Sequence, residues 1–197
     1  MRFHSVHTTG NYLMEGFALK LDEFLNMPDD GNRYELVDGE MHMFSTPSTY
    51  HQVIVRNVVN QFSVRDCGRH SEIFLGPINL FILGQVLTPD FLFVRHCNLS
   101  IVTRRGIEGT PDLVGEVVSS SNTRNDLIDK LALYERTVVK EYWILYPEFR
   151  MVEQYIHNGR EYSRPNRYVS GNVISSNNIP YVEIKVDLLF ETKLNLF

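Results

Sequence analysis

The chain has 197 residues, of which 43% are hydrophobic and 22% are charged, and its formal net charge is −5. This composition can bury one full hydrophobic core, while the negative charge argues against a protein that coats nucleic acid through a basic surface. It does not exclude an enzyme that meets phosphate groups through a divalent metal ion.

The first elements predicted along the chain are a short helix and a β-hairpin, which follow a loose segment at residues 1–17. Residues 18–27 (ALKLDEFLNM) have helical spacing. Residues 33–44 (RYELVDGEMHMF) place Asp38-Gly39 between two strand-like runs, and this dipeptide is a strong short-range hairpin signal.

A longer amphipathic helix is predicted next. Ile54, Val58 and Phe62 recur every four residues, so their side chains share one helix face. Ser48 or Thr49 is in position to cap the N-terminus of this helix, because a hydroxyl can accept a hydrogen bond from a free backbone N–H of the first turn.

The middle of the chain predicts three strands, a helix and a further strand. The strand candidates are residues 72–84, 86–94 and 112–118. Residues 123–137 run from a polar cap region through apolar positions at helical spacing. Residues 141–146 (EYWILY) form a short apolar run of the kind that makes a buried strand.

The C-terminal part predicts a hairpin and several short strands. Asn158-Gly159 is the second hairpin signal. The apolar residues of VEIKVDLLF (182–190) are more than one domain readily covers, so a homodimer is one expectation. In order, the elements predict a single α/β (α+β) domain at residues 18–197, with a central sheet flanked by helices.

Carboxylates gather on the predicted strands. Asp90 lies in the second strand candidate, Asp112 begins the third, and Glu116 lies within the third among apolar residues. A buried ionised carboxylate is costly unless it is paired or binds a metal ion. If the two strands pair, Asp90 and Glu116 can meet on one side of the sheet, where Mg²⁺ would hold them together. Lys130, on the next helix, can reach the same end of the sheet.

Each of these residues also has a purely structural interpretation. Asp112 follows a proline, which suits a turn or the start of a strand. Asp126 and Lys130 are four residues apart on a helix, which by itself indicates an exposed ion pair. His51, near a helix start, is interpreted as a polar surface residue. The residue types alone therefore leave open both a metal site and a plain α/β domain.

The chain resembles the Uma-two family of bacterial proteins, a branch of the restriction-endonuclease-like PD-(D/E)XK superfamily. The matching segments are LDEFLNMPDDGNRYELVDGEMHMFSTPSTYHQ, TPDFLFV, GTPDLVGEVVSSSNTRNDLIDKLALYERTVVKEYWILYPE and the closing hairpins. They follow the family order from about residue 19 to about residue 190. The resemblance implies a restriction-endonuclease-like fold, with a central mixed β-sheet flanked by helices and additional β-hairpins at both ends.

The resemblance also implies a site of four residues. Asp90 matches the PD aspartate of the superfamily, and Glu116 matches the acid of its (D/E)XK motif. Val118 occupies the position of the motif lysine, which in this family lies on the following helix, so Lys130 is the matching residue. Glu35 matches an additional glutamate near the site. The implied ligands of Mg²⁺, or of Mn²⁺, are Asp90 and Glu116, with Lys130 assisting the attacking water.

The chain departs from the family pattern in two loops beside the implied site. Residues 119–122 read SSSN where the family has SPST, and residues 138–140 read VVK where the family has Gly-Val before EYW. Neither departure removes one of the four implied site residues.

The resemblance implies a metal-dependent endonuclease that acts on nucleic acid, with DNA as the expected substrate. The rival function is a member that has lost efficient catalysis and serves as a nucleic-acid-binding or assembly module. Cys67 and Cys97 follow no metal-ligand spacing, and no run reaches the roughly 18 apolar residues that span a bilayer. The first residues do not have the features of a signal peptide. We therefore expect a cytoplasmic protein with no membrane segment.

Overall fold

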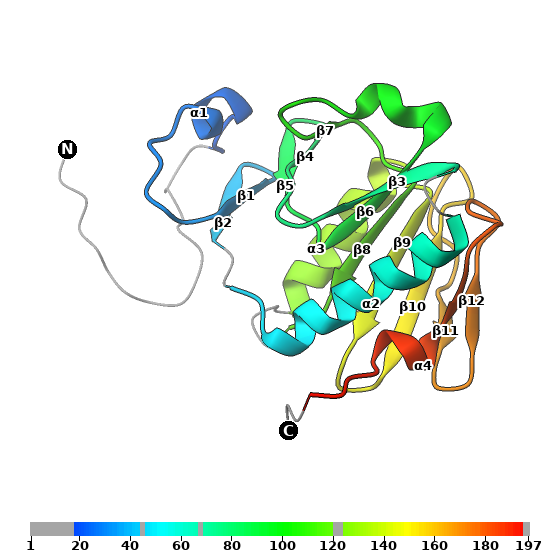
Figure 1. Ribbon diagram of the computed structural model, residues 1–197. Coiled ribbons are helices and arrows are strands. Elements are labelled where there is room, and N and C mark those ends of the chain that lie inside the picture. Colours follow the sequence, from blue (N-terminus) through cyan, green and yellow to red (C-terminus); the bar gives the residue numbers. More distant parts are fainter. Residues whose placement is uncertain (1–17, 44–45, 67–68, 120–123, 195–197) are drawn as a thin grey trace.

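The computed structural model describes residues 18–43, 46–66, 69–119 and 124–194, and all elements below lie within these ranges. The expected loose segment at residues 1–17 lies outside them. Within these ranges the chain forms a large mixed sheet with helices on both faces and a smaller sheet at one end (Figure 1).

The large sheet, called the main sheet below, has six strands. They are β3 (Ser71–Leu75), β6 (Phe91–Arg95), β8 (Leu113–Val117), β9 (Glu141–Tyr146), β10 (Met151–Ile156) and β11 (Asn166–Tyr168). Their spatial order is β11-β10-β9-β8-β6-β3, and β8 and β9 are parallel while the other neighbours are antiparallel. The predicted central mixed sheet is therefore confirmed.

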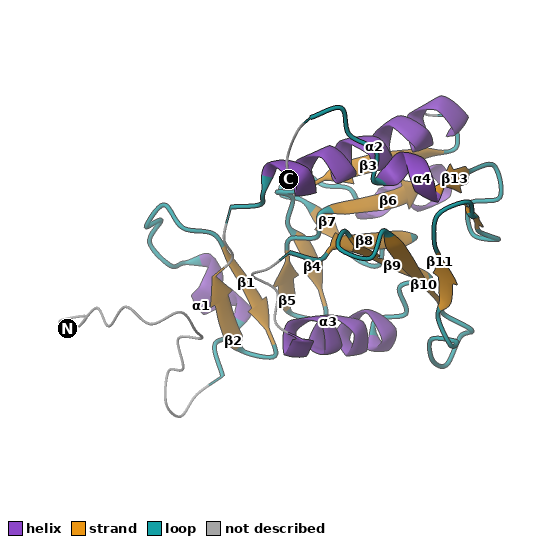
Figure 2. Cartoon of the chain, turned by 90° about the horizontal axis from the view of Figure 1, so that it is seen from below, coloured by secondary structure: helices purple, strands orange, loops and turns teal. Residues whose placement is uncertain are grey.

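Two long helices cover opposite faces of the main sheet, as Figure 2 shows. They are α2 (Thr49–Asp66) and α3 (Arg124–Arg136). The Ser48 hydroxyl accepts a hydrogen bond from the backbone N–H of His51 at 3.2 Å, which confirms the predicted N-cap of α2. Both helices were predicted from their apolar periodicity, and each buries its apolar side against the sheet.

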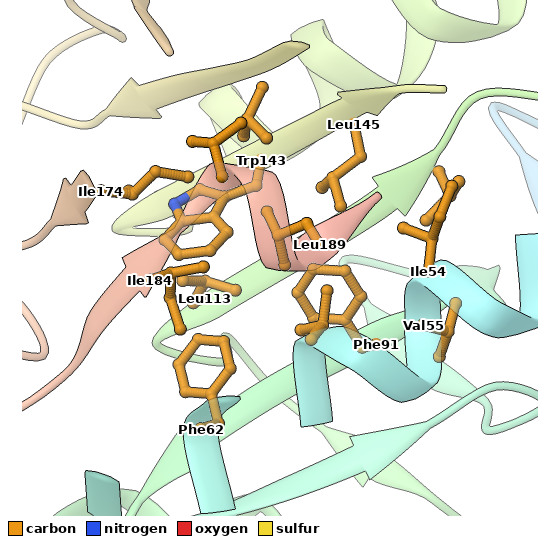
Figure 3. Close-up of a cluster of buried hydrophobic side chains, with 14 of the residues drawn as sticks. Ile54, Val55, Phe62, Phe91, Leu113, Trp143, Leu145, Ile174, Ile184 and Leu189 are labelled. Atoms are coloured by element: carbon orange, nitrogen blue, oxygen red, sulfur yellow. The ribbon is translucent and has the colours of Figure 1, made fainter. Parts of the chain in front are cut away.

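The face of the main sheet under α2 holds the larger hydrophobic cluster, part of which Figure 3 shows. Ile54 and Phe62 of α2 enter this cluster, as the four-residue spacing predicted. The Phe62 ring lies 5.8 Å from that of Trp143, between ring centroids. A second cluster under α3 includes Leu133 and Tyr134. Strands β6, β8 and β9 are thus buried on both faces, which explains their nearly continuous apolar sequences.

The smaller sheet has the order β2-β1-β5-β4-β7. Its strands are β1 (Tyr34–Val37), β2 (Glu40–Met43), β4 (Leu80–Ile82), β5 (Gln85–Leu87) and β7 (Ile107–Glu108). The predicted hairpin is β1–β2, and its turn residues Asp38 and Gly39 have φ of 50° and 81°, the conformation that an Asp-Gly turn favours. The predicted helix at 18–27 is confined to the five residues of α1 (Leu21–Leu25).

Two strands predicted as continuous are each divided in two. The run 72–84 breaks at Pro77 into β3 and β4, and the run 86–94 breaks at Pro89 into β5 and β6. In both cases the two halves belong to different sheets. Proline has no N–H to donate to a strand ladder, so each break falls where the chain can leave one sheet for the other. Asp90 lies at the second crossing point.

The C-terminal segment is partly helical, contrary to the prediction of strands throughout. A two-stranded sheet of β12 (Val173–Ser175) and β13 (Glu183–Lys185) is followed by helix α4 (Val186–Leu189). Val186, Leu189 and Phe190 are buried in the cluster under α2. The apolar C-terminal residues therefore cover the chain's own core, which removes the reason given above for expecting a dimer.

A strand and a turn in the second half of the chain also match the sequence predictions. The strand predicted at 141–146 is β9, and Asn158-Gly159 forms the predicted turn, where the Asn158 side chain accepts hydrogen bonds from two backbone N–H groups. The 3₁₀ helix η1 (His96–Ile101) was not predicted. No helix in the described ranges is long and apolar enough to cross a membrane.

Candidate active site

The pairing of β6 with β8 places two acidic residues across from each other. In this antiparallel pair Phe91 is opposite Gly115, so the next step along the register puts Asp90 opposite Glu116. The backbone N–H of Val117 donates to Asp90 Oδ2 at 2.7 Å and ties the aspartate to the strand that carries the glutamate. A Cβ on Gly115 would lie 1.9 Å from Phe91 Cζ, so glycine leaves room for the Phe91 ring over β8.

Lys130 approaches Glu116 from helix α3. Its Nζ lies 3.0 Å from Glu116 Oε1, and the Tyr134 hydroxyl, one helical turn later, donates to the same oxygen at 3.2 Å. The Lys130 side chain is only 12% exposed, so the exposed ion pair with Asp126 indicated by spacing is the wrong description of this lysine. The Asp126 side chain itself lies outside the described part of the chain.

Glu35 reaches the same lysine from the smaller sheet. Its Oε1 accepts a hydrogen bond from the backbone N–H of Thr88 at 2.7 Å and lies 3.2 Å from Lys130 Nζ. The Thr88 N–H belongs to the segment that joins β5 to β6, just before Asp90. The ammonium of Lys130 therefore bridges one carboxylate from each sheet, Glu35 and Glu116.

Burial dominates the electrostatics of this cluster. It raises the pKa of Glu116 to about 8; the Lys130 ammonium opposes the rise, and the Asp90 and Glu35 carboxylates add to it. Burial alone would lower the pKa of Lys130, but its attraction to Glu116 and Glu35 outweighs burial and raises that pKa. Burial and the nearby Glu116 raise the pKa of Tyr134, so the phenol stays protonated and donates its hydrogen bond.

His51 is a site residue that the sequence interpretation missed. It is buried rather than on the surface, and its Nε2 lies 3.0 Å from Asp90 Oδ2. The only signal in the sequence was its place in the first turn of α2, one turn before the apolar face begins at Ile54. The contact of His51 with Asp90 depends on how α2 packs over the main sheet, and this packing could not be inferred from the sequence alone.

Asp112 lies at the start of β8, as predicted, but away from the residues above. Its Oδ2 accepts hydrogen bonds from the Arg95 backbone N–H at 2.9 Å and from Asn98 Nδ2 at 3.1 Å. Its Oδ1 lies 2.7 Å from Lys140 Nζ. Asp112 is thus a buried, fully partnered aspartate whose contacts hold the beginning of the strand in place, four residues before Glu116.

The structure therefore brings Asp90, Glu116, Lys130 and Glu35 to one end of the main sheet. In the described part of the chain, no group of three or more His, Cys, Asp and Glu side chains is arranged to hold a metal ion as it stands. Two of the carboxylates instead share the Lys130 ammonium, and the third contacts the His51 imidazole.

The fold is shared with a solved structure. A crystal structure described as “a putative nuclease belonging to DUF820”, from Anabaena variabilis, superposes with a TM-score of 0.74 over 87% of this chain and 97% of its own. The identity between the two is 16%, so the likeness concerns the fold. The two chains therefore share a fold, and the predicted fold class of a central mixed sheet flanked by helices is confirmed.

The family model of Uma2, described as “Putative restriction endonuclease”, matches residues 21–187. The chain belongs to this family, and the resemblance stated from the sequence is confirmed. A search of curated proteins gave no match.

Proposed function

We propose that the chain is a Mg²⁺-dependent endonuclease that hydrolyses phosphodiester bonds, with DNA as the expected substrate and Mn²⁺ as an alternative ion. Asp90 and Glu116 would hold the metal, Lys130 would assist the attacking water, and Glu35 would complete the site. The observation that carries the proposal is the hydrogen bond of 2.7 Å that ties Asp90 to Val117, next to Glu116 on β8, together with a buried ammonium 3.0 Å from the glutamate. Membership of the Uma2 family supports the reaction class.

The residues at this end of the sheet fit a divalent cation. Carboxylate oxygens are the ligands that Mg²⁺ prefers, and three carboxylates converge here. Within the described residues, the hydrogen-bond donors contact only one oxygen of each carboxylate. These oxygens are Oδ2 of Asp90, Oε1 of Glu116 and Oε1 of Glu35. Burial first, and the neighbouring Asp90 and Glu35 carboxylates next, raise the pKa of Glu116, so an ionised Glu116 is poorly stabilised by Lys130 alone. A divalent cation would supply the missing positive charge.

When bound, the metal would lower the pKa of an attacking water and neutralise charge that develops on the phosphate. The chain's own groups would do the rest. Val117 N–H fixes the orientation of the Asp90 carboxylate, and Tyr134 fixes that of Glu116. The Lys130 ammonium, close to both glutamates, would share the phosphate charge and orient the water, because preorganised charges in a buried site act strongly.

The rival function, a binding or assembly module without efficient catalysis, is favoured by one observation. Lys130 is engaged by two carboxylates and is 12% exposed, so its ammonium is not free to meet a phosphate in this arrangement. In that case the cluster would serve to join the two sheets. The two functions differ in whether cleavage occurs at all and in whether it depends on a divalent ion.

Nicking of supercoiled plasmid DNA in Mg²⁺, in Mn²⁺ and in chelator tests the proposal, with linear duplex DNA, single-stranded DNA and RNA as parallel substrates. Asp90→Asn should reduce cleavage to background. Asp112→Asn, the matched change at another proline-preceded aspartate, should retain most of it at a temperature where both variants are folded. If no substrate is cleaved although the protein binds Mn²⁺, the endonuclease proposal is wrong and the binding module stands.

A further inference from the structure

The contact between His51 and Asp90 joins helix α2 to the candidate site. The His51 side chain is 6% exposed, and its Nε2 lies 3.0 Å from Asp90 Oδ2. It comes from the first turn of α2, where the Ser48 hydroxyl accepts the backbone N–H of the same residue. Hydrogen bonds therefore hold both the backbone and the ring of His51. Within the described residues, Asp90 is the only hydrogen-bond partner of the ring.

The hydrogen-bonding pattern favours one tautomer of the His51 ring. A carboxylate can only accept, so Nε2 must carry the proton that lies between it and Asp90. His51 Nδ1 is buried and has no hydrogen-bond partner within the described residues. A proton on Nδ1 would therefore be a buried donor without an acceptor, which is the more costly arrangement. The neutral ring with its proton on Nε2 fits both observations.

Two donors then converge on the same oxygen of Asp90. His51 Nε2–H and the Val117 backbone N–H, at 3.0 and 2.7 Å, both address Oδ2. One donor comes from the helix above the sheet and the other from the strand that carries Glu116. Two fixed donors on one oxygen set the orientation of the carboxylate. Oδ1 is then the oxygen that can contact a cation or a substrate group.

We infer that His51 is a positioning residue for Asp90: its Nε2–H holds Oδ2 of the carboxylate, so that Oδ1 would be left to a bound cation. The inference rests on the proposed function, since it assumes that Asp90 binds a cation. Partners of this kind, one step removed from the metal, typically change metal affinity by about 10- to 100-fold when they are removed. His51 itself would touch neither metal nor substrate.

Replacement by amides tests this geometry, because the amide nitrogen of Gln reaches the place of Nε2 whereas that of Asn reaches only the place of Nδ1. Mn²⁺ affinity is measured by electron paramagnetic resonance for the full chain and for His51→Leu, His51→Asn and His51→Gln. We expect Leu and Asn to weaken Mn²⁺ binding by about 10- to 100-fold. Gln should restore most of the wild-type affinity. The rate of Mn²⁺-dependent plasmid nicking should follow the same order.

His70→Leu is the matched control. His70 and Asp66 form a second histidine–aspartate contact at the other end of α2, with Nδ1 and Oδ1 2.8 Å apart. That change should leave Mn²⁺ affinity at the wild-type value. Unchanged affinity in His51→Leu, or equal affinities in the Asn and Gln variants, would overturn the positioning role while the endonuclease proposal stood.

Nitrogen NMR of the histidine rings in the metal-free protein tests the role of His51 separately from the proposed endonuclease function. We expect the His51 ring to carry its proton on Nε2. A proton on Nδ1 with Nε2 bare would overturn the inference, whatever the metal experiments give. If the wild-type protein binds no Mn²⁺ although the Nε2 tautomer is found, the proposed function fails, and with it the claim that Oδ1 is directed at a metal.

Discussion

At the scale of single residues, the candidate site is defined by a buried lysine rather than by a surface one. Spacing on the helix indicated that Lys130 is one end of an exposed pair, for which removal would change stability little. The structure instead places its ammonium against two buried carboxylates, Glu35 and Glu116. Removing one partner of a buried ion pair leaves an uncompensated charge, which is far more costly than losing an exposed pair.

Lys130→Ala should therefore abolish cleavage and also destabilise the metal-free protein, by about 3–5 kcal/mol in urea unfolding. Lys130→Arg should restore little activity, because a planar guanidinium does not replace a compact ammonium in this space. Mg²⁺ should recover part of the lost stability, since it supplies positive charge to the same carboxylates.

The double variant Lys130→Met/Glu116→Gln is the control for this prediction, because it removes Lys130 together with one of the two glutamates that contact it, so that only Glu35 loses its partner. It should be more stable than Lys130→Ala in the absence of metal. If Lys130→Ala unfolds at the same urea concentration as the wild-type protein, the lysine is not holding the carboxylates and the buried-pair description is wrong.

Glu116 should give the stability of the metal-free protein a characteristic pH dependence. Its pKa is raised from an ordinary 4.5 to about 8, so between these values the folded protein holds a proton that the unfolded chain has released. This contribution to stability is complete below pH 4.5 and is lost as the pH rises through 8. The expected slope is a loss of about 1.4 kcal/mol per pH unit.

Glu116→Gln removes the titrating group, so its stability relative to the wild-type protein should increase with pH by the same slope of about 1.4 kcal/mol per unit. Urea unfolding at pH 5.5, 6.5 and 7.5 measures the difference at about unit spacing. Tyr134→Phe is the control, because it removes a hydrogen bond to Glu116 but keeps the carboxyl, and it should retain the wild-type slope. A constant difference between Glu116→Gln and the wild-type protein would show that Glu116 is ionised throughout.

At the scale of elements, the end of helix α3 carries a strained residue. Val138 follows the helix with a φ of 58°, a left-handed conformation that β-branched residues rarely adopt. The Val138 N–H donates to the Glu135 carbonyl and the Val139 N–H to the Tyr134 carbonyl, which is the Schellman arrangement of a helix C-terminus. Glycine usually occupies this position, and the family pattern has glycine there.

Val138→Gly should therefore stabilise the protein, because it relieves a strain of about 1–2 kcal/mol and loses few contacts from a side chain that is half exposed. The gain is reduced by the greater freedom of glycine in the unfolded chain, so we expect a net increase of about 1 kcal/mol in the free energy of unfolding. Val169→Gly, at a similarly exposed valine without positive φ, should lower it by about 0.5–1 kcal/mol. A loss of stability in Val138→Gly would contradict the strain.

The elements that the sequence predicted correctly are those whose signal is local. Apolar periodicity located α2 and α3, and the Asp-Gly and Asn-Gly dipeptides located two turns. The sequence could not show that the two long strand candidates cross between sheets, because each half has the same apolar character as one strand. Nor could it show that Val186 begins a helix, since four residues are too short for a helical period to appear.

The candidate site residues also differ in how far local sequence could predict them. The carboxylates Asp90 and Glu116 were predictable because charged residues inside apolar strands are rare and need a partner. Lys130 was expected at this end of the sheet from its place on the following helix, whereas Glu35 depended on the family resemblance, because its contact with Lys130 joins residues 95 positions apart in the chain. His51 was missed because only the packing of α2 over the sheet brings its ring to Asp90.

At the scale of the whole molecule, the charge distribution limits how this protein can meet nucleic acid. The net charge is −5, and the candidate site holds three carboxylates and one lysine. A chain with this net charge gives little long-range attraction for phosphate groups beyond the site itself. Proteins that bind through basic tracks make about 6–10 phosphate contacts, and their affinity falls steeply with salt, since each contact releases counterions.

We therefore expect weak salt dependence from the folded protein. If no more than about three phosphates are contacted, a plot of log(kcat/KM) against log of monovalent salt concentration should have a slope no steeper than about −3 for duplex DNA. The measurement is the nicking rate at low substrate concentration, over a range of KCl at constant Mg²⁺. Glu153→Gln, a change at a buried glutamate paired with Arg167 away from the site, is the control for altered charge alone and should keep the slope. A slope near −6 or steeper would mean that an extended basic contact surface exists, and that the acidic charge of the chain does not govern how it meets its substrate.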